Sequence, residues 1–139
     1  MNRKELEMIS DFPLGEENKK FAEYFIGKSY LSFLNDKEVY IFNITFEPGC
    51  RNNWHIHHGA GQILICTGGK GWYQEQGKEA RLLKSGEIVY IPPEVKHWHG
   101  AVIDEGFAHL SLALPAENSS NEWCEPVTDE EYEKLNYKK

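Results

Sequence analysis

The sequence contains no hydrophobic run long enough to cross a membrane. It has no window of about 18 consecutive apolar residues, and its first residues, MNRKELEMISDF, lack the apolar stretch of a secretory signal. We therefore expect a soluble, cytoplasmic protein with no membrane partner.

Cysteines and basic residues are also few. The three cysteines, Cys50, Cys66 and Cys124, are odd in number and have no CxxC spacing, which excludes a disulfide framework and a zinc knuckle. The 15 Lys and Arg residues are scattered and outnumbered by 22 Asp and Glu residues, so the formal charge is −7. Such a surface repels a phosphate backbone, and nucleic acid is not expected as a partner.

The main pattern is one of short segments rich in β-branched and aromatic residues, which Gly, Pro and Asn interrupt. This pattern predicts an all-β, antiparallel sandwich or barrel. The candidate strands are Phe21 to Phe25, Ser29 to Leu34, Glu38 to Phe46, Trp54 to His57, Gln62 to Thr67, Gly71 to Glu75, Glu79 to Leu82, Glu87 to Ile91, His97 to Ala101 and Phe107 to Leu114. The predicted turns between them include Gly68-Gly69.

Only the two ends of the chain differ from this pattern. Residues 1–20 are polar and are interpreted as an N-terminal arm, and residues 21–139 as a single domain. Thr128 and Glu131 have the spacing of a capping box, which predicts a short C-terminal helix.

All six histidines fall between positions 55 and 109, and five of them form two groups, His55-Ile-His57-His58 and His97-Trp-His99. Residues two apart on a strand point to the same face, so each group directs a pair of imidazoles to one side. His58 should point to the other side, as should Trp54 and Trp98, which adjoin His55 and His97 in the sequence.

Two such pairs among apolar strand residues indicate a metal site, because buried imidazoles without a partner are costly. A lone histidine on a strand would instead be an ordinary surface or hydrogen-bonded residue. Neutral imidazole suits Mn, Fe, Co, Ni, Cu or Zn, and Gln62 can add a carbonyl oxygen.

The spacing of these residues resembles the cupin superfamily. Gly49, His55-Ile-His57, Gln62 and Gly69 are similar to its first motif, and Gly86 with Pro92-Pro-Glu-Val-Lys-His97 to its second. Gln62 replaces the usual acidic ligand, Glu94 a usual Gly, and Ala101 a usual Asn. The resemblance implies a double-stranded β-helix, which is a jelly-roll-like barrel.

A closer resemblance is to single-domain bacterial cupins that include manganese-dependent hydroxynitrile lyases and carboxymuconolactone decarboxylase-associated cupins. It rests on TFEPG, WHIHHGAGQILICTGGKGW, SGEIVYIPPEVKHWHGA, FAHLSLAL and EWCEPVTDEEY. It implies one divalent ion, with Mn preferred over Fe, Ni or Zn, held by His55, His57, Gln62 and His97. The spacing from His57 to Gln62 is one residue longer than in those lyases.

The same resemblance assigns roles to further residues. His99 and His109 would be the acid and base partners of a small-molecule substrate, and Asn52, near the barrel mouth, would contact that substrate. Without the resemblance, His109 would be read as a core histidine and Asn52 as a turn former.

Two classes of function therefore remain open. One is an enzyme that uses the metal as a Lewis acid on a carbonyl or hydroxyl substrate, with cyanohydrin chemistry as one version and oxygen chemistry as another. The other is a non-catalytic cupin that binds a metabolite or metal. An exposed apolar face on the N-terminal strands predicts a homodimer, and the pocket volume depends on how Phe42, Ile44, Leu64, Tyr90 and Leu112 pack inward.

Overall fold

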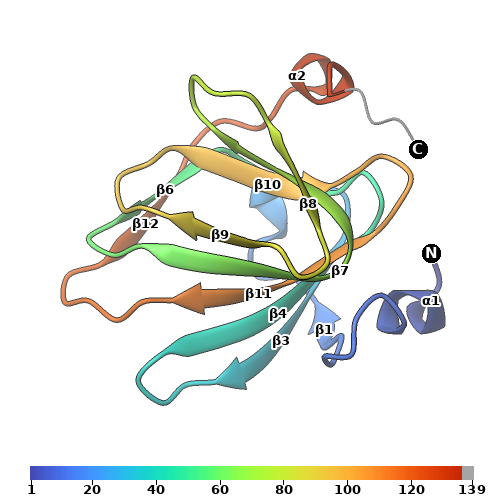
Figure 1. Ribbon diagram of the computed structural model, residues 1–139, viewed down its shortest axis with the longest axis horizontal. Helices are drawn as coiled ribbons and strands as arrows, with labels where there is room; N and C mark the ends of the chain where they lie inside the picture. The colour runs from blue at the N-terminus through green and yellow to red at the C-terminus, as the bar shows by residue number, and fades with distance from the viewer. Residues whose placement is uncertain (136–139) are drawn as a thin grey trace.

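The strands of this protein form one antiparallel sheet that curls into a barrel, with two short helices outside it (Figure 1). The computed structural model describes residues 1–135. The helices are α1 (Arg3–Glu7), a 3-10 helix (Ala22–Tyr24) and α2 (Asp129–Glu133). The strands are β1 (Glu16–Glu17), β2 (Phe25–Ile26), β3 (Ser29–Asn35), β4 (Tyr40–Phe46), β5 (Arg51–Asn52), β6 (His55–His58), β7 (Gln62–Glu75), β8 (Arg81–Lys84), β9 (Ile88–Ile91), β10 (His97–Ala101), β11 (Phe107–Ala113) and β12 (Ser120–Trp123).

The prediction of an all-β, jelly-roll-like barrel is confirmed. The strand order β1-β3-β4-β11-β7-β10-β5-β2 carries β8 and β9 on β7, and β6 pairs with both β10 and β12. Among residues 1–135, no helix combines the length and apolar character that a membrane span requires.

Strand β7 joins the two halves of the barrel. Its first part pairs with β11 and β9, and its second part pairs with β10 and β8. The turn predicted at Gly68-Gly69 is wrong, because these glycines form a bend inside a continuous strand. Gly69 has φ +68°, and a Cβ there would lie 1.8 Å from Gly106 O. Glycine allows the strand to bend where another backbone approaches closely.

Further expectations about strands and about inward-pointing side chains need correction. Phe21 to Phe25 is not one strand, because the Asn18 side chain accepts a hydrogen bond from Phe21 N and the chain turns into the 3-10 helix before β2. Strands β1, β5 and β12 were not predicted. Tyr90 and Leu112 do not point inward: Tyr90 is 55% exposed, and both lie in register with outward-facing Ile63.

The two faces of the barrel wall bury different clusters. Phe46, Leu64, Ile91 and Phe107 belong to the inner core. Trp54, Trp72 and Trp98 pack instead with Val127 and Tyr132 of the C-terminal segment. The predicted outward direction of Trp54 and Trp98 is confirmed, and the capping box that starts α2 at Thr128 is also present.

The N-terminal arm is part of the packed structure. Leu6 and Leu14 are buried, and Asn43 on the outer face of β4 donates a hydrogen bond to Pro13 O. The arm therefore covers one part of the outer sheet face. The predicted domain limits, 1–20 and 21–139, stay a prediction, and positions 136–139 of the second range lie outside the described residues.

Candidate metal centre

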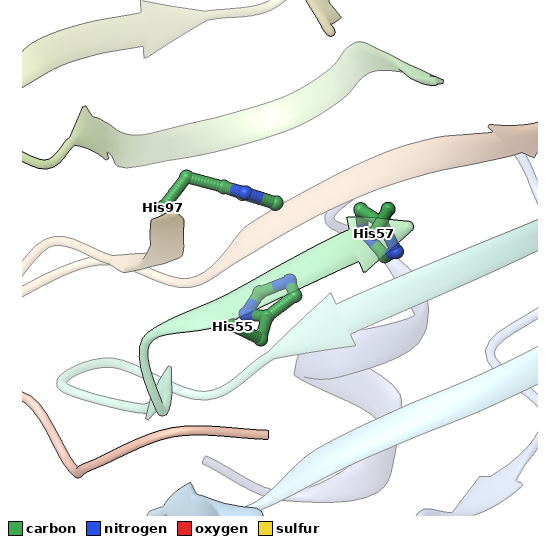
Figure 2. A group of neighbouring side chains, drawn as sticks. All are labelled: His55, His57 and His97. Carbon is green, nitrogen blue, oxygen red and sulfur yellow. The ribbon is translucent and has the colours of Figure 1, made fainter. Parts of the chain in front are cut away.

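Three of the predicted ligands meet on two paired strands. His55 and His57 come from β6 and His97 comes from β10 (Figure 2), where His97 lies in register with His55. One candidate ligand atom from each imidazole lies within 4.8 Å of the others. A single divalent ion could therefore contact all three rings after small side-chain adjustments.

The Nδ1 atom of each of these imidazoles already has a hydrogen-bond partner. Nδ1 of His55 lies 2.8 Å from Asn53 O, Nδ1 of His97 lies 2.9 Å from Val95 O, and Nδ1 of His57 lies 2.6 Å from Oδ1 of Asn121. An acceptor oxygen at Nδ1 keeps the proton there and leaves the Nε2 lone pair for another partner. Nε2 of His57 and Nε2 of His97 are buried and have no hydrogen-bond partner.

Burial keeps two of these imidazoles, those of His55 and His97, in their neutral form. It lowers the pKa of His97 to about 4 and holds the pKa of His55 well below its usual range, with the neighbouring His97 adding to the effect on His55. A metal ligand must be neutral imidazole, so no deprotonation is needed at these two residues near pH 7. Ring nitrogens that lie this close together, two of them buried without a partner, fit a divalent transition metal.

Gln62, at the start of β7, lines a cavity that His55 and His57 also line. Its Nε2 donates to Oγ of Ser111 on β11, while its Oε1 is buried without a partner. The Ser111 contact thus determines which end of the amide is available. The free end is the oxygen, which is the end that a hard or borderline cation binds.

His99, Asn52 and His109 are also buried in the barrel. Asn52 accepts a hydrogen bond from the backbone N of His99 at 2.9 Å, and its Nδ2 lies 3.1 Å from Nε2 of the same ring. His99 and His109 meet edge to face with ring centroids 4.9 Å apart. Asn52 and His99 line the cavity, whereas fully buried His109 packs behind His99.

Burial also lowers the pKa values of this second pair of histidines. The pKa of His109 falls to about 4, and the pKa of His99 falls well below its usual range, with His109 as the second cause. Both rings are therefore neutral at pH 7 and can accept a proton.

The cavity beside these groups has a volume of about 280 Å³ and a largely apolar wall. That wall is made by the side chains Phe21, Phe25, Leu31, Phe42, Ile44, Phe46 and Trp123. An apolar cavity with a few converging polar groups suits a small organic ligand that has one polar end.

His58 lies at the rim and bonds away from the three-histidine group. Its Nδ1 contacts Glu94, and its Nε2 lies 2.8 Å from Glu122 Oε1. Hydrogen bonds to these carboxylates, with Glu122 first, raise the pKa of His58.

Glu94 has φ +69°, a conformation that explains why a glycine is usual at its place in the cupin motif. Here the glutamate keeps that backbone and adds contacts to His58 and Gly59.

Sequence reasoning did not find several residues around this centre. Ser111 follows His109 by two positions on a strand, so alternation could have placed it inside. Asn121 and Trp123 belong to β12, whose sequence SNEW has no strand-like apolar alternation. Only the tertiary structure brings them to the centre.

Comparison with known proteins gives one consistent family. The Cupin domain family matches residues 42–112. An (R)-mandelonitrile lyase of Granulicella tundricola is 41% identical over 90 residues, which is 65% of this chain and 68% of the relative.

Two solved structures extend the likeness to the fold. A cupin-like protein of Thermotoga maritima has a TM-score of 0.83 and 41% identity, covering 92% of this chain and 98% of its own. A second structure from the same organism, described as a predicted oxalate decarboxylase, has a TM-score of 0.66 with 17% identity, covering 76% and 95%. At that lower identity the likeness concerns the fold alone.

Proposed function

Because this chain belongs to the cupin domain family, we propose that it is a metal-dependent enzyme acting on a small substrate with a carbonyl or hydroxyl group. The metal would be one divalent transition ion, Mn²⁺ before Fe, Ni or Zn, held by His55, His57, Gln62 and His97. The observation that carries the proposal is the meeting of three histidine nitrogens within 4.8 Å of one another beside a largely apolar cavity. Two of those rings, His57 and His97, have a buried Nε2 without a partner.

The ion, when bound, would supply a Lewis acid that polarises the substrate oxygen. The apolar wall would hold the organic body of the substrate and exclude water from the polar end. This combination suits a substrate whose oxygen lies beside an aromatic or aliphatic group. The relative's name specifies such a compound, mandelonitrile.

His99 is the residue that we propose as the base. Asn52 Oδ1 accepts from the His99 backbone, so the Nδ2 of that amide is the donor toward His99 Nε2. The neutral ring then carries its proton on Nδ1, and its Nε2 lone pair accepts from Asn52 Nδ2 until a substrate hydroxyl displaces that amide and delivers its proton there. His109, which packs against His99 edge to face, would hold that ring in place rather than contact the substrate.

For a cyanohydrin the atoms balance without any co-reactant. The hydroxyl proton moves to His99 Nε2, the carbon–carbon bond breaks with its electron pair on cyanide, and the oxygen becomes the carbonyl of an aldehyde. Cyanide then takes the proton back from His99 and leaves as HCN. The reverse sequence forms the cyanohydrin.

Cellular context and assembly are also proposals. Cys50, Cys66 and Cys124 are free thiols, which suits a cytoplasmic protein. A homodimer would use the outer sheet face that the N-terminal arm leaves uncovered. The outward side chains there are Ile41, Ile63, Ile65, Ile88, Tyr90, Leu110 and Leu112.

The test is a comparison of three proteins for metal content and turnover. The parent, a His55→Ala/His97→Ala variant and a His99→Ala variant are loaded with Mn²⁺, dialysed and assayed for aldehyde release from racemic mandelonitrile. We expect about one Mn per parent chain and turnover, no metal in the double variant, and retained metal with 10²- to 10⁴-fold lower turnover in His99→Ala. A parent that retains metal without turning over cyanohydrins would favour a binding module or oxygen chemistry.

A further inference from the structure

Strand β12 runs beside β6, the strand that carries His55 and His57. It pairs antiparallel with β6, so that Asn121 lies opposite His57 and Trp123 lies opposite His55. The ring centroids of Trp123 and His55 are 4.9 Å apart. The two inward positions of β12 therefore contact two of the three histidines.

The three histidines differ in what orients them. His55 and His97 are held by backbone oxygens only two residues away, Asn53 O and Val95 O. His57 is held by a side chain that lies 64 residues further along the chain. A backbone oxygen cannot be removed by substitution, whereas the partner of His57 can.

From this difference we propose that Asn121 is a positioning residue of the metal centre. Its Oδ1 accepts the proton of His57 Nδ1 at 2.6 Å and so directs the unpartnered Nε2 toward the ion. The proposal rests on the proposed metal site, but its effect on the His57 ring can be measured without metal. Outer partners of ligating histidines commonly contribute 10- to 100-fold in metal affinity.

The position of Asn121 makes it suitable for substitution. It is exposed and lies on β12, which pairs only with β6 among the described strands. Strand β12 is also attached by contacts that do not involve Asn121. Trp123 stacks on Tyr24 with centroids 4.6 Å apart, and Glu122 contacts His58. Removal of the Asn121 amide should therefore leave β12 in place.

The experiment compares the Mn²⁺ dissociation constant of the parent with those of three variants of the full chain. Asn121→Ala removes the hydrogen-bond acceptor of His57, and Asn121→Asp keeps an acceptor oxygen. Glu122→Ala removes the contact between β12 and His58 but leaves the partner of His57 in place. We expect the dissociation constant to rise about 10- to 100-fold in Asn121→Ala and to stay within a few-fold of the parent in the other two.

A second readout is the tautomer of His57 in metal-free protein, from nitrogen-15 NMR at pH 8. We expect the proton on Nδ1 in the parent and in Asn121→Asp, and a mixture of tautomers in Asn121→Ala. An Asn121→Ala variant with the affinity and the His57 tautomer of the parent would overturn the proposal. An equal loss of affinity in Glu122→Ala would also overturn it, because the loss would then come from displacement of β12 and not from the Asn121 side chain. A parent that binds no metal would refute the proposed metal site, and the tautomer result would still decide whether Asn121 orients His57.

Discussion

Asn52 holds His99 at two points, because it accepts a hydrogen bond from the backbone of His99 and lies 3.1 Å from Nε2 of its ring. The two residues come from β5 and β10, which pair side by side. If His99 is the base, as proposed, this contact would let Asn52 act on the chemistry through His99, in addition to the substrate contact predicted from the sequence.

The first prediction concerns this pair. Asn52→Ala frees the His99 ring, and turnover of mandelonitrile should fall roughly 10- to 100-fold while metal content stays unchanged. Asn52→Asp places a carboxylate beside the ring, which raises the pKa of His99 and moves the acid limb of the pH–rate profile to higher pH. Steady-state kinetics from pH 4 to 9 check both, and an unaltered profile in Asn52→Asp would contradict the proposed role of His99 as base.

The second prediction concerns stability and pH. The pKa of His109 is about 4 in the folded protein, below the ordinary value of about 6.5 in the unfolded chain. Between these values the unfolded chain binds more protons, so the free energy of unfolding decreases as pH falls from about 6.5 to 4. His109 alone contributes about 3 kcal/mol to this loss.

Urea denaturation of metal-free protein at several pH values measures that slope. His109→Phe keeps an aromatic ring next to Phe46 and Phe107 but cannot titrate, so the decrease between pH 7 and pH 4.5 should be smaller than in the parent. Equal slopes would show that His109 does not stay neutral in the fold.

The third prediction concerns the bend in β7. Gly69→Ala forces a Cβ to within 1.8 Å of Gly106 O, and we expect about 2 to 4 kcal/mol of destabilisation. Gly77 is the matched control, because it also has positive φ, +83°, but has no atom near its Cβ position. Gly77→Ala should lose only about 1 kcal/mol from backbone strain. Thermal unfolding of both variants gives the comparison, and similar losses would mean that the clash at Gly69 is relieved by movement.

The fourth prediction concerns assembly. Ile88 and Tyr90 are 56% and 55% exposed on the outer sheet face, so an Ile88→Lys/Tyr90→Lys variant should convert the proposed homodimer to a monomer. Tyr40→Lys is the control, since Tyr40 is 51% exposed but lies opposite Ala113, on the inward-facing register. Light scattering coupled to gel filtration measures the mass. A parent that elutes as a monomer at all concentrations would exclude this interface.

Much of the inner wall could be predicted from alternation along single strands. Alternation predicts His55 with His57, and His97 with His99, on shared faces, and Trp54 and Trp98 on the opposite face. In the structure His55, His57 and His97 meet, the His97 and His99 rings stack, and the two tryptophans pack in the outer cluster. Alternation failed for Tyr90, because its neighbours Val89 and Ile91 are the inward residues of β9. A short run in which every residue is apolar carries no signal that distinguishes its two faces.

The sequence by itself determined the class of fold and the histidines that are candidate ligands, since strand periodicity and histidine chemistry are local properties. Only the tertiary structure decided which atoms the side chains of the site face. It placed Asn121 opposite His57, Ser111 beside Gln62 and Asn52 beside His99, and it turned the glycines at positions 68 and 69 into a bend rather than a turn. These relationships join residues 47 to 64 positions apart, and pairing over such separations depends on the packing of the whole barrel rather than on local sequence.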